Sequence, residues 1–134
     1  MKEVKSRRDY VVTLEEWTDL EKTPFDNEYE VHLQIKNLYT SKVIDVLETL
    51  LPTFINEDDH LEVIHYRKKQ SIQYVTYIKG EYFTIEIKDG LTSGYNGEGS
   101  NGLEYVLRRL GFSETLAAIV YDKKYDSAVI RIRK

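Results

Sequence analysis

Hydrophobic and polar side chains alternate cleanly between residues 28 and 36. One side of this segment is apolar throughout and carries Tyr29, Val31, Leu33 and Ile35. A period of two places successive side chains on opposite faces of a strand. The pattern therefore predicts a half-buried strand over 28–36.

After Asn37 the spacing of apolar residues changes from two to about 3.6. The new stripe consists of Val43, Val46, Leu47, Leu50, Leu51 and Phe54. This spacing predicts an amphipathic helix over 39–51, which weakens at Pro52 because the residue before a proline disfavours helical geometry.

Three strands are predicted next, over 61–67, 72–78 and 82–88, joined by short polar turns. Such short connections allow only antiparallel neighbours. A helix is predicted over 101–110, and Gly111 follows it as a typical C-terminal cap.

The N-terminal part predicts a strand over 9–13 that leads into a helix over 14–22. Thr13 and Glu16 have the spacing of a capping box, which marks a helix start. A loop follows this helix at Pro24.

At the other end, strands over 116–121 and 127–133 are predicted to form a hairpin. The chain as a whole, 1–134, is therefore predicted to be one α+β domain. We expect a mainly antiparallel sheet with two or three helices packed on one face.

Composition narrows the classes of protein. The chain has 134 residues, a formal net charge of −4 and no cysteine. The missing thiols exclude disulfide scaffolds, thiolate zinc sites and cysteine nucleophiles, and the acidic balance argues against a partner that is a nucleic acid duplex. No apolar run reaches the roughly 18 residues of a membrane span, and no secretory signal is recognisable. We therefore expect a cytoplasmic protein with no membrane partner.

Glycine is concentrated in one segment. Five of the seven glycines lie between positions 90 and 102, after a predicted strand and before a predicted helix. Such a loop can aim backbone N–H groups at an anion, next to the positive end of the helix. No Walker A loop is present. Gly97, Gly99 and Gly102 have the glycine spacing of the dinucleotide-binding fingerprint, but the strand before them belongs to an antiparallel meander and not to a βαβ unit. Three interpretations stay open: a phosphate- or nucleotide-binding loop, a loop whose glycines only serve turn geometry, and a loop that binds a partner protein.

Other residues complete a candidate nucleotide site. Ser100 or Asn101 can cap the helix or hydrogen-bond to a ribose or phosphate oxygen. Arginine side chains match phosphate oxygens, and aromatic rings stack on bases. The candidate arginines are Arg109, Arg131 and Arg133, and the candidate rings are Tyr82, Phe83 and Tyr95.

The sequence gives little support to catalysis. The three histidines show no metal-ligand spacing, and no cofactor is predicted. Glu98 inside the glycine segment is the one residue that suggests a general base.

Residues 94–103, continuing through 105–112, resemble the glycine-rich turn and helix of the phage Thoeris anti-defence sponges of the first type. The resemblance implies a protein that sequesters a cyclic ADP-ribose signal without cleaving it, and that assembles as a dimer or larger homo-oligomer in the host bacterial cytoplasm. It implies ligand contacts from the glycine loop, with Gly97 and Gly99, and from the side chains of Asn96, Ser100, Asn101 and Arg109.

Three alternatives remain. The order of helix, three strands and helix follows double-stranded-RNA-binding domains, although the overall charge is acidic. A nucleotide-processing enzyme that uses Glu98 is the second alternative. A protein-binding inhibitor is the third.

Overall fold

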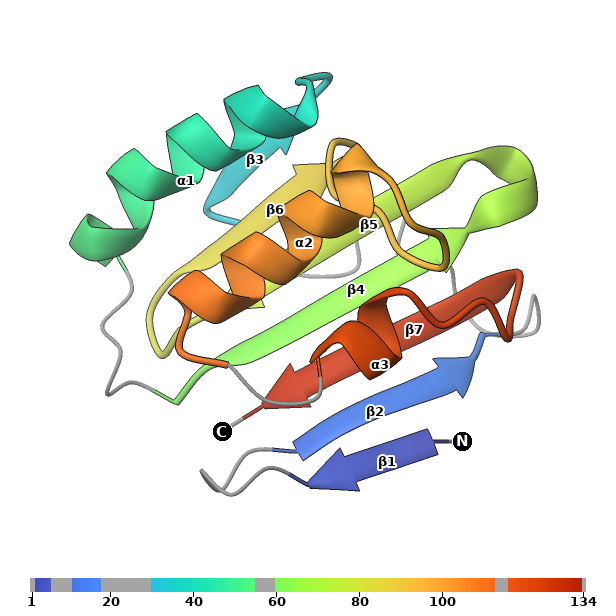
Figure 1. Ribbon diagram of the computed structural model, residues 1–134. Coiled ribbons are helices and arrows are strands. Elements are labelled where there is room, and N and C mark those ends of the chain that lie inside the picture. The colour runs from blue at the N-terminus through green and yellow to red at the C-terminus, as the bar shows by residue number, and fades with distance from the viewer. Residues whose placement is uncertain (1, 6–10, 18–29, 55–59, 113–115, 134) are drawn as a thin grey trace.

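In the computed structural model, the described residues are 2–5, 11–17, 30–54, 60–112 and 116–133, and their strands form one seven-stranded sheet (Figure 1). The strand order is β1-β2-β7-β4-β5-β6-β3. The strands are β1 (Lys2–Lys5), β2 (Val11–Glu16), β3 (Leu33–Lys36), β4 (Glu62–Lys68), β5 (Gln73–Lys79), β6 (Thr84–Lys88) and β7 (Ser127–Arg133). The helices are α1 (Thr40–Phe54), a single 3-10 turn η2 (Lys69–Ser71), α2 (Glu98–Arg109) and α3 (Leu116–Val120).

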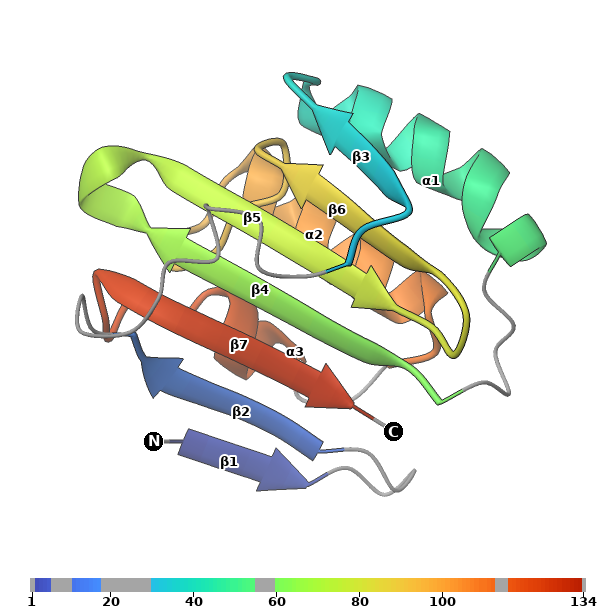
Figure 2. The ribbon, with the colours of Figure 1, turned by 180° about the vertical axis from the view of Figure 1, so that it is seen from behind.

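Every neighbouring pair of strands is antiparallel except β3 and β6, which run parallel. α1, α2 and α3 all cover the same face of the sheet, as the two opposite views show (Figures 1 and 2). This arrangement confirms the predicted α+β class, with a mainly antiparallel sheet and helices on one face. All the strands belong to one sheet, which is consistent with a single domain.

The helix-covered face carries the larger core. Register places Ile132, Val63, Ile78 and Ile85 in one row across four strands. These side chains pack under the apolar stripes of α1 and α2, and most of the cluster is less than about one-twentieth exposed. α1 and α2 approach closely where Gly102 meets Thr40, because a Cβ on Gly102 would lie 2.3 Å from the Thr40 methyl carbon.

α2 ends as the sequence predicts. Gly111 has a φ of 95°, its N–H donates to the Arg108 carbonyl, and the Phe112 N–H donates to the Leu107 carbonyl. This pair of bonds is a Schellman motif, which satisfies the last carbonyls of a helix. Phe112 is fully buried, so the motif also directs the chain back into the core.

The opposite face of the sheet has a smaller, aromatic cluster. Trp17, Tyr66 and Tyr77 meet edge to face, with ring centroids 5.9 Å and 6.3 Å apart in the two pairs. Glu86 is fully buried there and accepts hydrogen bonds from Tyr77 Oη at 2.8 Å and Gln34 Nε2 at 2.9 Å. Each carboxylate oxygen therefore has a donor, which a buried carboxylate requires.

Two predicted elements are wrong. The helix predicted from Leu14 is instead the strand β2, in which Leu14 is fully buried opposite Ile130 of β7. The pairing with β7 outweighs the capping-box signal, because local propensity yields to tertiary contacts. The strand predicted over 116–121 is the short helix α3. The rest of the first predicted helix, 18–22, lies outside the described residues.

Other boundaries shift by a few residues. β6 begins at Thr84, so Tyr82 and Phe83 belong to the turn before it and not to the strand. α2 begins at Glu98 rather than at residue 101. β1 was not predicted at all. Among the described residues, none of the helices is long and apolar enough to cross a membrane.

Candidate functional site

Unusual backbone geometry gathers at one end of the molecule. The β4–β5 turn and the β6–α2 loop lie toward the right in Figure 1, and the β3–α1 connection lies at the same end of the sheet, at the top of the view, because β3 runs parallel to β6. Each contains a non-glycine residue at positive φ: Asn37 at 60°, Ile72 at 53° and Asp89 at 67°. A β-branched residue such as Ile72 rarely takes this conformation, which costs on the order of 1–2 kcal/mol. Strained backbone of this kind concentrates at functional sites.

The β4–β5 turn and the β6–α2 loop border an open hollow of about 580 Å³, which we name the loop-end concavity. Its size falls within the usual range for small-molecule sites. The Ile72 side chain is 77% exposed on its rim, and Tyr95 is 38% exposed. Its lining residues are Ile72, Tyr74, Asp89, Gly90, Thr92 and Tyr95.

The first turn of α2 lies directly behind this concavity. The Thr92 hydroxyl donates to Tyr95 Oη at 2.9 Å and lies 3.1 Å from the Ser100 hydroxyl. The Tyr95 ring also covers Gly97, where a Cβ would come within 2.6 Å of a ring carbon. Gly97 is the N-cap of α2 and caps it without a side-chain hydrogen bond. The positive end of the helix dipole is therefore next to Tyr95.

A buried polar network supports the loop from below. His65 Nδ1 lies 2.8 Å from the Thr76 hydroxyl, and His65 Nε2 lies 2.9 Å from the Ser93 hydroxyl. Arg67 donates to Ser93 Oγ at 3.3 Å and to the Tyr125 carbonyl at 2.7 and 3.1 Å. All four network side chains, on Thr76, His65, Ser93 and Arg67, are at most 1% exposed. Such a satisfied network holds the loop in one conformation.

Electrostatics keep His65 neutral. Burial, with a further contribution from the Arg67 charge, lowers the pKa of His65 to about 3. Because Arg67 donates to Ser93, a consistent assignment has Ser93 donating to Nε2 and His65 donating from Nδ1 to Thr76. The neutral imidazole stacks on Tyr74, with centroids 6.3 Å apart, and Tyr74 forms a wall of the loop-end concavity. Burial, and then the neighbouring Tyr95, raises the pKa of Tyr74.

Internal packing accounts for the glycines of the loop. A Cβ on Gly94 would lie 2.7 Å from Arg67 Nη1, and one on Gly99 would lie 2.4 Å from Thr92 Oγ1. Gly90 and Gly94 also have φ near 85°. The N–H of Thr92 donates to the Gly99 carbonyl at 3.2 Å, and the N–H of Gly94 donates to Val120 at 2.8 Å. These two N–H groups are satisfied inside the protein, so they do not form the predicted anion nest.

The residues predicted within the loop lie close together. Tyr95 and Asn96 are exposed, whereas Gly99 and Ser100 are buried in the first turn of α2. Asn101 is exposed and accepts a hydrogen bond from Tyr121 Oη at 2.6 Å. Neither Ser100 nor Asn101 caps α2, so the predicted cap is wrong, and a contact with a ribose or phosphate oxygen stays a prediction.

The predicted arginines lie away from the loop within one chain. Arg109 lies at the C-terminal end of α2, roughly 16 Å along the helix from Glu98, and pairs with Glu48 at 3.1 Å. Arg131 and Arg133 are on the opposite face of the sheet, because they alternate with the core residue Ile132.

The other two predicted rings are also remote. Tyr82 and Phe83 lie in the β5–β6 turn, at the far end of β6 from the glycine loop. Tyr82 is 87% exposed, and Phe83 stacks on His32 with centroids 5.2 Å apart. Among the predicted aromatics, Tyr95 alone lines the loop-end concavity.

Sequence reasoning missed Ile72, Tyr74, Asp89 and Thr92. Tyr74 shares the period-two face of Thr76 and Ile78, so the sequence places it on the helix-covered side. Asp89 precedes Gly90 in a typical turn dipeptide. The left-handed backbone of Ile72 has no signal in the sequence.

Comparisons with protein-family models, with curated proteins and with solved structures give no match to this chain. Over the part of the chain that the structure describes, no group of three acidic or histidine side chains is placed to hold a metal ion. The site must therefore be interpreted from its own geometry.

Proposed function

We propose that this protein binds and sequesters a cyclic ADP-ribose-type signalling nucleotide in the loop-end concavity, without cleaving it. In this proposal it is a phage anti-defence sponge that acts in the host bacterial cytoplasm and blocks Thoeris-type immunity. The observation that carries the proposal is the open hollow of about 580 Å³ lined by Tyr95, whose ring covers Gly97, the N-cap of α2.

The concavity offers a suitable group for each part of such a ligand. The exposed face of Tyr95 can stack on a base, which contributes about 1–3 kcal/mol. The N-terminus of α2 favours phosphate, and Lys69 lies nearby, with its ammonium 3.4 Å from the Gly94 carbonyl. The exposed carboxylate of Asp89 can accept hydrogen bonds from ribose hydroxyls.

The chemistry around the loop favours storage over turnover. The serine–histidine pair beneath the loop, Ser93 and His65, is fully buried, so its atoms cannot reach a ligand in the concavity. Glu98, which the sequence suggests as a general base, is exposed at the start of α2. A sequestering protein needs a rigid site, because preorganisation raises affinity, and the network beneath the loop supplies that rigidity.

The remote arginines suggest an assembly. Arg109, Arg131 and Arg133 are too far from the loop to reach a ligand held in the same chain. If these arginines contribute, a second copy must present them, as a closed two-fold assembly would allow. The proposal therefore includes a homo-oligomer, a dimer or larger.

An RNA-binding module is the second candidate, because one observation favours it. The order α1, β4, β5, β6, α2, with both helices on one face of the sheet, matches that of double-stranded-RNA domains. However, the arginines of α2 already pair with acidic groups, Arg108 with Glu104 at 2.7 Å and Arg109 with Glu48 at 3.1 Å. Phosphate contacts would have to replace these ion pairs.

The test exposes purified protein to the products of a TIR-domain enzyme, removes free nucleotide, heats the protein and analyses the released molecules by mass spectrometry. We expect intact cyclic nucleotide. Tyr95→Ala should weaken binding about 5- to 150-fold by calorimetry, the loss expected from one stacking ring. Tyr82→Ala, an exposed tyrosine at the far end, is the matched control and should bind normally.

Each contrary result has a definite meaning. Fragmented nucleotide indicates an enzyme. Equal binding by Tyr95→Ala and the parent chain, or a loss with Tyr82→Ala alone, removes the site assignment. A salt-dependent gel shift of duplex RNA without nucleotide recovery favours the RNA-binding module.

A further inference from the structure

A second hollow lies between α1 and α2, and it shares no lining residue with the loop-end concavity. It encloses about 130 Å³ between the C-terminal halves of the two helices. Its walls are apolar and consist of Ile44, Leu47, Leu51, Leu61, Val106 and Leu110. We name it the α1–α2 groove. None of these six residues is a proposed nucleotide contact; Arg109, at the mouth of the groove, would be one only if a second copy presents it.

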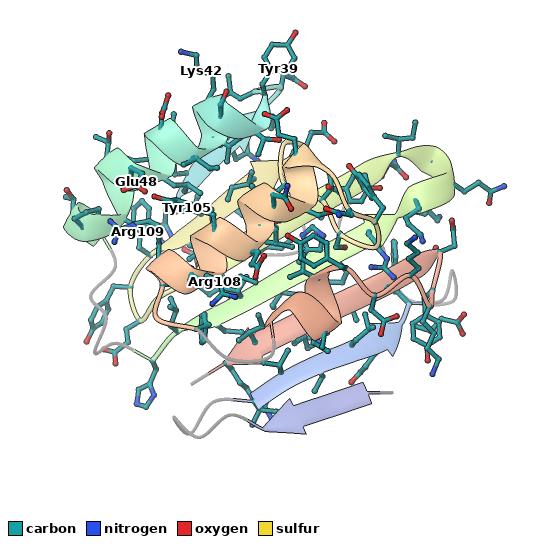
Figure 3. The ribbon with its side chains drawn as sticks, in the orientation of Figure 1. Tyr39, Lys42, Glu48, Tyr105, Arg108 and Arg109 are labelled. Atoms are coloured by element: carbon teal, nitrogen blue, oxygen red, sulfur yellow. The ribbon has the colours of Figure 1, made fainter. Side chains whose placement is uncertain are left out.

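A polar cluster closes the mouth of the groove. Glu48 of α1 accepts hydrogen bonds from Tyr105 Oη, from Arg109 Nε at 3.3 Å and from Arg109 Nη2 at 3.1 Å. Figure 3 shows these three side chains bridging the two helices. The Tyr105 hydrogen bond, and then Arg109, lowers the pKa of Glu48, so the mouth carries one negative and one positive charge at neutral pH.

The rim of the groove offers a hydrogen-bond acceptor. Glu48 and Pro52 both line the groove, and Pro52, inside α1, has no N–H to donate. The Glu48 carboxylate accepts hydrogen bonds at the mouth, so the rim favours a ligand that donates one.

Size and charge define the ligand class. An engineered apolar cavity of about 150 Å³ binds benzene, so a hollow of about 130 Å³ suits a molecule of similar size. Glu48 and Arg109 compensate each other's charge at the mouth, so a charged ligand would find no free opposite charge there to offset the loss of its hydration. We propose that the α1–α2 groove binds a small uncharged aromatic molecule with one hydrogen-bond donor, of the size and polarity of phenol.

The test is a titration of the labelled full chain followed by two-dimensional ¹H–¹⁵N NMR, with phenol, benzene, benzoate and benzylammonium as probes. Phenol should shift the amides of the groove and saturate with a Kd of about 1 mM, as expected for seven heavy atoms. Benzene should bind more weakly, because it donates no hydrogen bond. The charged probes should bind at least about tenfold more weakly, because burying a charged head is costly.

Filling the groove gives the decisive comparison. Ile44→Phe, or Leu51→Phe if the first variant does not fold, should abolish phenol binding and leave nucleotide binding unchanged. Thr49→Phe places the same ring on an exposed position of α1 and should bind phenol normally. The proposal is overturned if phenol gives no saturable shifts in the groove, if benzoate or benzylammonium binds as well as phenol, or if a filled variant still binds it. Tyr95→Ala should not affect phenol, so the two sites can fail independently.

Discussion

The buried histidine gives this protein a characteristic response to acid. His65 is 1% exposed, and its pKa is lowered from 6.5 to about 3 by burial and by Arg67. In the unfolded chain the same imidazole takes up a proton as the pH falls through about 6.5. Between these two values the unfolded state binds more protons than the folded state. Stability is therefore full above the unfolded pKa and declines as the pH falls toward 3.

The size of the effect follows from the difference between the two pKa values. Each pH unit below 6.5 removes about 1.4 kcal/mol, so His65 alone costs about 2 kcal/mol at about pH 5 and up to about 5 kcal/mol at the lower pKa. With a urea m-value of about 2 kcal/mol/M, the unfolding midpoint should fall by about 1 M between about pH 7.5 and 5.

The assay is urea unfolding of the parent chain, His65→Gln and His60→Gln at both pH values. Carboxylates also titrate in this range, and their contribution is common to all three proteins. His65→Gln should be less stable than the parent by a constant amount at both pH values. It should not show the additional loss of about 2 kcal/mol that the parent shows on acidification. His60→Gln removes an exposed imidazole and should respond as the parent does. If the parent and His65→Gln lose equal stability on acidification, the assignment of His65 as a buried neutral imidazole is wrong.

Three further predictions concern packing, and thermal or urea unfolding tests each of them. Gly99→Ala should destabilise the protein by about 1–3 kcal/mol, because its Cβ would lie 2.4 Å from Thr92 Oγ1. Adding Thr92→Ser to this variant leaves the contacting oxygen in place, so the double variant should not regain the lost stability. Arg67→Met should cost about 3 kcal/mol, because it leaves the Tyr125 carbonyl and Ser93 without their donor; a loss below about 1 kcal/mol would show that the network contributes little. Gly111→Ala should cost about 1–2 kcal/mol, because φ is 95° at that position, and a neutral result would contradict the Schellman geometry.

Much of the fold could be predicted from periodicity. The predictions for β4, β5, β6 and the C-terminal end of α2 agree with the structure within two residues. The helix predicted over 39–51 begins within one residue of α1 but ends three residues too early, because α1 continues through Pro52 to Phe54. The patterns of these elements are long and unambiguous, and the helices cover the face that those patterns make apolar. The parallel pairing of β3 with β6 could not be predicted, because an alternating strand pairs equally well in either direction.

Short segments were harder. All five residues of α3 are apolar and show no period, so a buried strand and a buried helix give the same pattern. The conformation of β2 was equally ambiguous, because the sequence from Val11 to Leu14 fits the end of a strand followed by the start of a helix. The pairing of Leu14 with Ile130 decides the conformation, and that partner is more than a hundred residues away in the sequence.

The predicted site shows where charge and composition mislead. Arg131 and Arg133 follow the glycine loop in the sequence, but they alternate with Ile130 and Ile132, whose side chains face the helices. The same parity that identified those isoleucines as core residues places the arginines on the other face, so their separation from α2 could have been derived from the sequence.

The concentration of glycines in the loop was also ambiguous in the sequence. Gly94 leaves room for the guanidinium of Arg67 and Gly99 for the hydroxyl of Thr92, so both are needed for contacts inside the protein. No sequence pattern distinguishes a glycine that admits a ligand from one that admits a neighbouring side chain, since both require only the absence of a Cβ. The tight packing behind the loop holds Tyr95 and the first turn of α2 beside an open hollow. The ligand contacts proposed here therefore depend on the exposed side chains of the loop and on the helix end, and not on a glycine-lined nest.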